Sequence, residues 1–272
     1  MESGLSQSGK IDQDVDWSVP WLAPVRAIGT QIANNTAWRD ELNRVAQRID
    51  LRNDRGLPIQ FVLQQVLPVG ESYEAFISQT GQVPTRDNLH DFFNALIWLT
   101  FPRIKSRLNA LQSAQIARLG IGKSRGQARD AATLFDENAA LLVVSDTDEG
   151  SALVDNLRAH HWNEVFVQRR EQFNQHAEVV LFGHAIMEKL VRPYKAITAH
   201  TVVCRVDRDF HQLPLQERHV ILDQLVARQL AEQDLLPNIF SPLPILGVPG
   251  WWPNQDIQFY ADSGVFRPAR QK

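Results

Sequence analysis

Residues 87–101 read DNLHDFFNALIWLTF and carry the longest helical pattern in the chain. Asp87 or Asn88 can accept hydrogen bonds from free backbone N–H groups, so a helix is expected to begin there. Apolar residues then recur at helical spacing until Pro102, which interrupts the helix. They are Leu89, Phe92, Phe93, Leu96, Ile97 and Leu99. We expect a helix this apolar to be buried inside a mainly helical domain.

Similar spacing of apolar residues predicts further helices on both sides of this one. They are expected over residues 36–49, 72–77, 103–119, 151–158, 162–173, 184–191 and 215–230. Strands are expected over residues 59–67 and 201–206, whereas residues 179–182 fit either structure.

Residues 133–144 are interpreted as a hairpin, with strands at 133–135 and 140–144 and a turn at Asp136, Glu137 and Asn138. From Pro237 onward, proline, glycine and aromatic residues predict extended chain that wraps over the body. The expected fold class is therefore α+β: a mainly helical single domain over residues 17–270, with a small antiparallel sheet and an extended C-terminal wrap. Residues 1–16 are polar and are expected to form a flexible N-terminal tail.

Composition restricts the classes of function. The chain has 272 residues, of which 44% are hydrophobic and 22% are charged, as in ordinary globular proteins. Its formal net charge of -3 gives no general attraction to nucleic acid or to an anionic membrane. Cys204 is the single cysteine, so no intrachain disulfide can form. Without a signal peptide or a membrane-spanning apolar run, the chain is expected to be soluble and cytoplasmic.

Four strings resemble those of a known family. They are HDFFNALIW at residues 90–98 followed by Phe101-Pro102, LFDEN at 134–138, FGHA at 182–185 with Glu188-Lys189, and GVPGWW at 247–252. Together they resemble a proteobacterial family catalogued as domain of unknown function 3025, over roughly residues 17–270. One departure is Ala139, where the family is expected to carry glycine, so a tight turn would shift its positive φ to Asn138. The resemblance implies no activity.

His184 and Glu188 are four residues apart on an expected helix, which places both side chains on one face. Imidazole and carboxylate suit zinc, iron or manganese, and a catalytic metal site usually has three protein ligands. His200 or His90 could supply the third. A surface or partly buried hydrogen bond between His184 and Glu188 is the alternative, and it explains the same spacing.

Asp136 and Glu137, at the expected turn, could act as general acid or base, together with His90. Alternatively, they perform ordinary turn hydrogen bonding, while His90, Asp91 and Asn94 cap the long helix.

Other residues are weaker candidates for substrate binding. Asn94, one turn after His90, could contact the same substrate, and Arg125 and Arg129 could contact phosphate or RNA or instead pair with the acidic turn. Trp252 could line a pocket or anchor the C-terminal wrap. Gly122-Lys123-Ser124 lacks the earlier glycine and the strand of a phosphate-binding loop.

Three functional hypotheses remain open at this point. The first is a small-molecule enzyme, in its sharpest form a hydrolase that depends on a divalent metal, with Asp136 or Glu137 as base. The second is a non-catalytic binding or scaffold module, in which the same polar residues connect loops to helices. The third is a factor that contacts phosphate or RNA through a local basic patch. The sequence gives no indication of oligomeric state or substrate.

Overall fold

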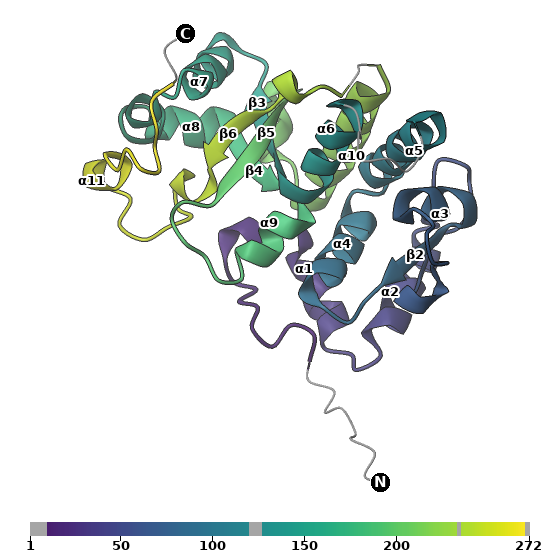
Figure 1. Ribbon diagram of the computed structural model, residues 1–272. Helices are drawn as coiled ribbons and strands as arrows, with labels where there is room; N and C mark the ends of the chain where they lie inside the picture. Colours follow the sequence, from purple (N-terminus) through teal and green to yellow (C-terminus); the bar gives the residue numbers. More distant parts are fainter. Residues whose placement is uncertain (1–9, 120–126, 233–234, 270–272) are drawn as a thin grey trace.

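The computed structural model describes residues 10–119, 127–232 and 235–269. Two layers of structure meet around one hydrophobic core, with a helical region built from the first half of the chain and a mixed sheet built from the second half (Figure 1). The protein is thus a mainly helical α+β domain, as the sequence predicts.

The helical region contains α1 (Ala23–Ala33), α2 (Trp38–Arg48), α3 (Tyr73–Thr80), α4 (Leu89–Thr100), α5 (Pro102–Leu119) and α6 (Gln127–Asn138). A small parallel pair, β1 (Gln60–Leu63) and β2 (Gln82–Thr85), lies beside α2 and α3. The expected strand at 59–67 is therefore shorter than predicted, because a 3-10 turn occupies Gln64–Val66.

The sheet has four strands in the order β4 (Ala177–Leu181), β3 (Ala139–Ser145), β5 (Thr198–Val206) and β6 (Ser241–Pro244). β3 pairs with β5 in parallel, whereas β4 and β6 pair antiparallel to their neighbours. All seven residues of β3 are buried, as expected for a central strand covered on both faces. Helices α7 (Asp148–Arg158), α8 (Arg170–His176), α9 (His184–Lys189), α10 (Leu215–Glu232) and α11 (Ile257–Tyr260) complete the fold.

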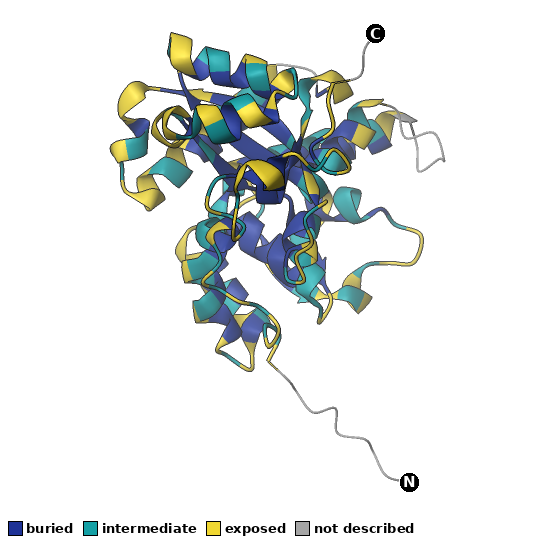
Figure 2. Ribbon diagram, turned by 90° about the vertical axis from the view of Figure 1, so that its left-hand side faces the viewer, coloured by how far each residue is buried: buried dark blue, intermediate teal, exposed yellow. Residues whose placement is uncertain are grey.

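Helix α4 is the centre of the helical region. Its N-cap is Asn88, whose side chain accepts from the backbone N–H of Asp91, as the sequence predicts. The α4 residues from Asp91 to Leu99 are all buried, so the helix presents no solvated face there (Figure 2). Phe101 ends α4, and Pro102 begins α5 directly after it, where a missing N–H costs nothing.

The predicted hairpin at residues 133–144 is wrong, although its second strand, at 140–144, is confirmed as part of β3. Because β3 pairs with β5 in parallel, the sheet is mixed and not antiparallel as expected. Residues 133–138 belong to α6, so Asp136 and Glu137 lie on the last helical turn rather than in a loop. Asn138 ends that helix and is absent from the described residues with positive φ, so the expected left-handed turn does not occur. Ala131, Ala132 and Phe135 form the buried stripe of α6, and tertiary packing of this stripe outweighs the strand-like local pattern.

The N-terminal segment is packed more closely than expected, and the C-terminal segment also contacts the core. Ile11 and Val15, in the expected tail, pack against the core, and Trp17 donates from Nε1 to Asp12 Oδ2 at 2.8 Å. After α10, the chain runs through short elements and packs Trp251 and Trp252 against the core.

Within the described ranges, no helix combines the length and the apolar character that a bilayer crossing requires.

Candidate functional site

A polar cavity of about 280 Å³ opens among helices α3, α4, α5, α6 and α9. Five residues that the sequence singles out line it, although they come from three separate helices: His90, Asn94, Asp136, Glu137 and His184. Convergence of distant polar side chains at one hollow is typical of a binding or catalytic site.

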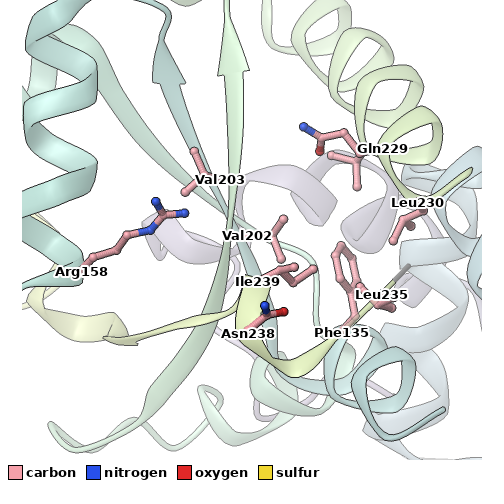
Figure 3. Close-up of a pocket in the computed structure, with 10 residues that line it drawn as sticks. Phe135, Arg158, Val202, Val203, Gln229, Leu230, Leu235, Asn238 and Ile239 are labelled. Atoms are coloured by element: carbon pink, nitrogen blue, oxygen red, sulfur yellow. The ribbon is translucent and has the colours of Figure 1, made fainter. Parts of the chain in front are cut away.

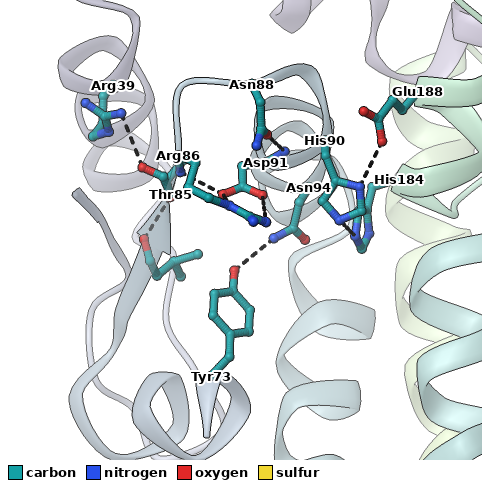
Figure 4. Close-up of polar contacts among 11 residues, drawn as sticks. Arg39, Tyr73, Thr85, Arg86, Asn88, His90, Asp91, Asn94, His184 and Glu188 are labelled. Atoms are coloured by element: carbon teal, nitrogen blue, oxygen red, sulfur yellow. Dashed lines mark hydrogen bonds and ion pairs between the residues drawn. The ribbon is translucent and has the colours of Figure 1, made fainter. Parts of the chain in front are cut away.

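His90 and His184 face each other across the junction of α4 and α9 (Figure 4). Their Nε2 atoms lie 3.2 Å apart, and the rings meet edge to face with centroids 4.6 Å apart. The other ring nitrogen of His90, Nδ1, lies 3.0 Å from Glu188 Oε2. An ionised carboxylate only accepts, so this contact assigns a proton to Nδ1 of His90.

Burial keeps His184 neutral. Its side chain is 5% exposed, and burial lowers the pKa to about 3. Lys105 and His90 act in the same direction, whereas the carboxylate and backbone carbonyl of Asp136 oppose the shift. Its Nδ1 nevertheless has no partner in hydrogen-bond geometry among the described residues. Neutral imidazole can present either a donor or an acceptor at Nε2, depending on its tautomer.

Gly183 positions His184 by allowing α9 to begin against the end of α6. A Cβ at residue 183 would lie 2.5 Å from the carbonyl oxygen of Glu137 and 2.7 Å from the nitrogen of Ala139. The Gly183 N–H also donates to the Ala139 carbonyl at 2.8 Å. Any side chain here would push His184 away from the cavity, so the glycine of the FGHA string serves close backbone approach.

A buried ion pair forms the opposite wall. Lys105 is 4% exposed; its Nζ donates to Asp136 Oδ1 and, at 2.8 Å, to Asn94 Oδ1. Burial is the largest single effect and raises the pKa of Asp136, but the charge and the hydrogen bond of Lys105, together with the neighbouring imidazoles, outweigh it, so the net effect lowers that pKa. Asp136 is therefore held ionised and is poorly suited to take up protons near neutral pH.

Asn94 connects this ion pair to Tyr73. The Asn94 amide donates from Nδ2 to the Tyr73 hydroxyl at 3.0 Å (Figure 4). Burial and the charges of Asp91 and Asp136 raise the pKa of Tyr73, so its hydroxyl keeps its proton and can donate. Asn94 thus uses both ends of its amide, which fixes its orientation.

Asp91 pairs with Arg86 in another part of the cavity lining. The guanidinium of Arg86 donates to Asp91 Oδ2 at 3.0 Å and to Oδ1 at 2.9 Å, and the Arg86 backbone N–H also donates to Oδ2. A two-point arginine–carboxylate pair of this kind holds both planes rigidly. The cap of α4 is Asn88, and Asp91 accepts from the Arg86 backbone N–H, whereas His90 and Asn94, also considered as caps, contact side chains of other helices.

A comparison with known protein families identifies the family of this chain. The family model described as "Protein of unknown function (DUF3025)" matches residues 59–270, which include every residue of the cavity wall. The chain belongs to this family. No curated protein and no solved structure matches the chain.

The remaining site predictions of this DUF3025 member have separate locations. Glu188 contacts His90, as above, whereas His200 lies on β5 with its ring centroid 6.3 Å from that of Phe240, away from the cavity lining. Burial and Lys189 lower the pKa of His200. Across the described parts of the chain, no three His, Cys, Asp or Glu side chains are grouped to hold a metal ion. Metal binding stays a prediction from the sequence.

The structure does not bring the other substrate-binding candidates to the cavity. Arg125 lies outside the described residues, and Arg129 lies on α6 away from the cavity lining. Trp252 is half-buried against the core and is not among the lining residues. Cys204 is buried, and burial raises the pKa of its thiol to about 12, in keeping with a packing role.

Sequence reasoning missed three residues of the site: Tyr73, Lys105 and Gln112. Lys105 and Gln112 share the inner stripe of α5 with Ile104 and Leu108, where helical periodicity requires apolar side chains. Polar residues at such positions are a usable signal, because unpaired burial would be costly. Tyr73 has no comparable signature in its own segment.

A second cavity, of about 320 Å³, lies beside β5 (Figure 3). Phe135, Leu230 and Leu235 form an apolar wall on one side of the strand, while Arg158 lies on the other side with Val203. This cavity has few polar groups that could act on a bound molecule, in contrast to the cavity at His90 and His184.

Proposed function

We propose that this protein is an enzyme that acts on a small polar molecule by general acid–base catalysis, with His90 as the catalytic residue. The observation that carries the proposal is the position of His90 between Glu188 and His184, at the wall of a polar cavity. Its side chain is 31% exposed, so a molecule in the cavity can touch it.

Glu188 and His184 are positioning residues in this proposal. Glu188 holds Nδ1 of His90, as an orienting carboxylate does for a catalytic imidazole. Neutral His184 can donate to Nε2 of His90 when that nitrogen is unprotonated and accept from it when it is protonated. Nε2 of His90 therefore has a partner in both protonation states, and a substrate exchanges a proton with that nitrogen by taking the place of His184.

The rest of the cavity supplies binding groups. The Tyr73 hydroxyl, the Asp136 carboxylate and the amide of Gln112 line the space that a substrate would fill. This assignment moves Asp136 from the base expected from sequence to an ionised binding group, because Lys105 lowers its pKa. If the enzyme uses a metal ion, His184 and Glu188 would be ligands and His90 a third. Elemental analysis of protein purified without a histidine tag tests this form of the proposal separately.

The experiment is depletion of metabolites from a small-molecule extract. Wild-type protein and the variants His90→Gln and His161→Gln are incubated with the extract, and mass spectrometry follows each compound. His161 is exposed and distant in sequence from the cavity residues, so His161→Gln is the matched control. We expect at least one compound to be consumed by wild type and by the control but not by His90→Gln.

The alternatives predict different outcomes. A binding or scaffold module consumes nothing in this experiment, whichever histidine is present. A factor that contacts RNA through basic residues would instead show binding that weakens steeply with salt and with loss of Arg129. Equal consumption by wild type and His90→Gln would remove the catalytic role of His90.

A further inference from the structure

The charge inside the cavity is unbalanced. Four carboxylates line it, those of Glu74, Asp91, Asp136 and Glu137, against the single guanidinium of Arg86. Arg86 is already committed to Asp91, and Lys105, behind the wall, is committed to Asp136. These pairs leave an excess of negative charge, to which Glu74 and Glu137 contribute.

The two remaining carboxylates have no cationic partner in the described parts of the chain. Glu74 accepts from the Ser72 hydroxyl at 2.9 Å, which is a neutral donor. Glu137 makes no ion pair there, although it lies on the last turn of α6 beside the cavity. A partly enclosed carboxylate is stabilised by a cation that enters the same space.

Gln112 is an independent sign of a ligand. Gln112 is 5% exposed and lines the cavity, and none of the hydrogen bonds found among the described residues involves its amide. Its amide atoms are not among the fully buried atoms without a partner, so the amide faces the open space of the cavity and bonds to whatever fills it, water or a ligand. A ligand in the cavity can supply hydrogen-bond partners for this amide.

From these features we infer that the cavity binds a small organic cation, an aliphatic amine in its ammonium form, which Glu74 and Glu137 attract and Gln112 contacts through its amide oxygen. A volume of about 280 Å³, near the lower end of the roughly 300–1,000 Å³ usual for ligand pockets, restricts the ligand to a small molecule. An organic ammonium is favoured over a metal ion because no three ligating side chains are grouped within the described residues. The inference rests on the proposed function in that both use the same cavity.

The test is calorimetric titration of the full chain, in EDTA, with three matched four-carbon probes. These are 1,4-diaminobutane, uncharged 1,4-butanediol and succinate. We expect binding of the diamine alone. The variants Glu137→Gln and Glu74→Gln should each weaken it about tenfold, a change that corresponds to one charged contact. Gln112→Leu should weaken it as well, whereas Glu217→Gln, an exposed control on α10, should leave it unchanged.

Four results would overturn the inference. The first is binding of succinate in place of the diamine, and the second is diamine binding that none of the Glu74, Glu137 and Gln112 variants changes. The third is no diamine binding in EDTA with strong binding of a divalent ion when EDTA is absent, and the fourth is no diamine binding by wild type in any condition. The titration measures binding without turnover, so loss of cation recognition and loss of catalysis are observed separately.

Discussion

The Nε2 atoms of His90 and His184 lie 3.2 Å apart, although 94 residues separate them in the chain. This contact joins α4 to α9 and gives His90 a neutral partner on the side opposite Glu188. Because burial lowers the pKa of His184 to about 3, this partner of His90 stays neutral.

The tautomer of His90 should depend on Glu188. Nitrogen chemical shifts of the imidazole should show a proton on Nδ1 of His90 in wild type, because the carboxylate accepts there. Glu188→Ala should move neutral His90 toward the Nε2-protonated tautomer, while Glu188→Gln, which keeps an acceptor oxygen, should not. An unchanged tautomer in Glu188→Ala would show that the carboxylate does not orient the ring.

The buried pair of Lys105 and Asp136 should be strongly coupled. Lys105→Met leaves a buried carboxylate without its cation, so the free energy of unfolding should fall by about 3–5 kcal/mol. In the double variant Lys105→Met/Asp136→Leu, the loss should be smaller than the sum of the two single losses. Urea denaturation of the four proteins measures this; strictly additive losses would show that the pair does not interact energetically.

Gly183→Ala should destabilise the start of α9. The added Cβ would lie 2.5 Å from a backbone carbonyl oxygen that cannot rotate away, so overpacking should cost about 1–3 kcal/mol. Gly250→Ala is not an equivalent control, since Gly250 has a φ of 83°. Ala185→Gly is a better one, because it changes the same string without adding atoms. Thermal unfolding with no loss in Gly183→Ala would mean that the two backbones can separate.

Asp223 should make stability fall as pH rises from about 4 to about 6. Burial raises its pKa to about 6 in the folded protein, even though its carboxylate accepts from the backbone N–H groups of Arg103 and Ile104. Between these pH values the folded state binds the Asp223 proton more tightly than the unfolded state does. The stabilisation that this proton gives is therefore fully present below the unfolded pKa of 3.8, and it is lost as the pH rises through the folded pKa of about 6.

Asp223→Asn removes this titration. The difference in free energy of unfolding between wild type and Asp223→Asn should therefore change by up to roughly 1.4 kcal/mol per pH unit between these two pKa values. Denaturant titrations at pH 4, 5, 6 and 7 measure it. The same difference at every pH would show that the pKa of Asp223 is the same in the folded and unfolded protein.

The sequence predicts α4 well because three local signals agree there. Asn88 is a good cap, the apolar residues recur at helical spacing, and Pro102 interrupts the pattern. Local signals mislead at α6: Asp136, Glu137 and Asn138 are common turn residues, and the strand that follows is uniformly apolar. The helix there packs Phe135 against Phe182, a tertiary contact that no local sequence pattern indicates.

The candidate site can be predicted only in part from the sequence, for the same reason. The spacing of His184 and Glu188 correctly places them on one helix, and His90 is one of the two histidines expected to join them. The choice between His90 and His200 depends on which helix packs against α9, and this is a property of the tertiary fold. The pairing of Lys105 with Asp136 likewise joins two helices whose order in space the sequence does not specify.

Steady-state kinetics of His90→Gln on the first compound that the depletion experiment identifies decides whether His90 is catalytic. We expect kcat to fall by roughly 100-fold or more while KM changes little, since a general acid–base residue contributes on the order of 10²–10⁴ to rate. His161→Gln should behave as wild type. A folded His90→Gln protein that retains the kcat of wild type would contradict the catalytic role of His90.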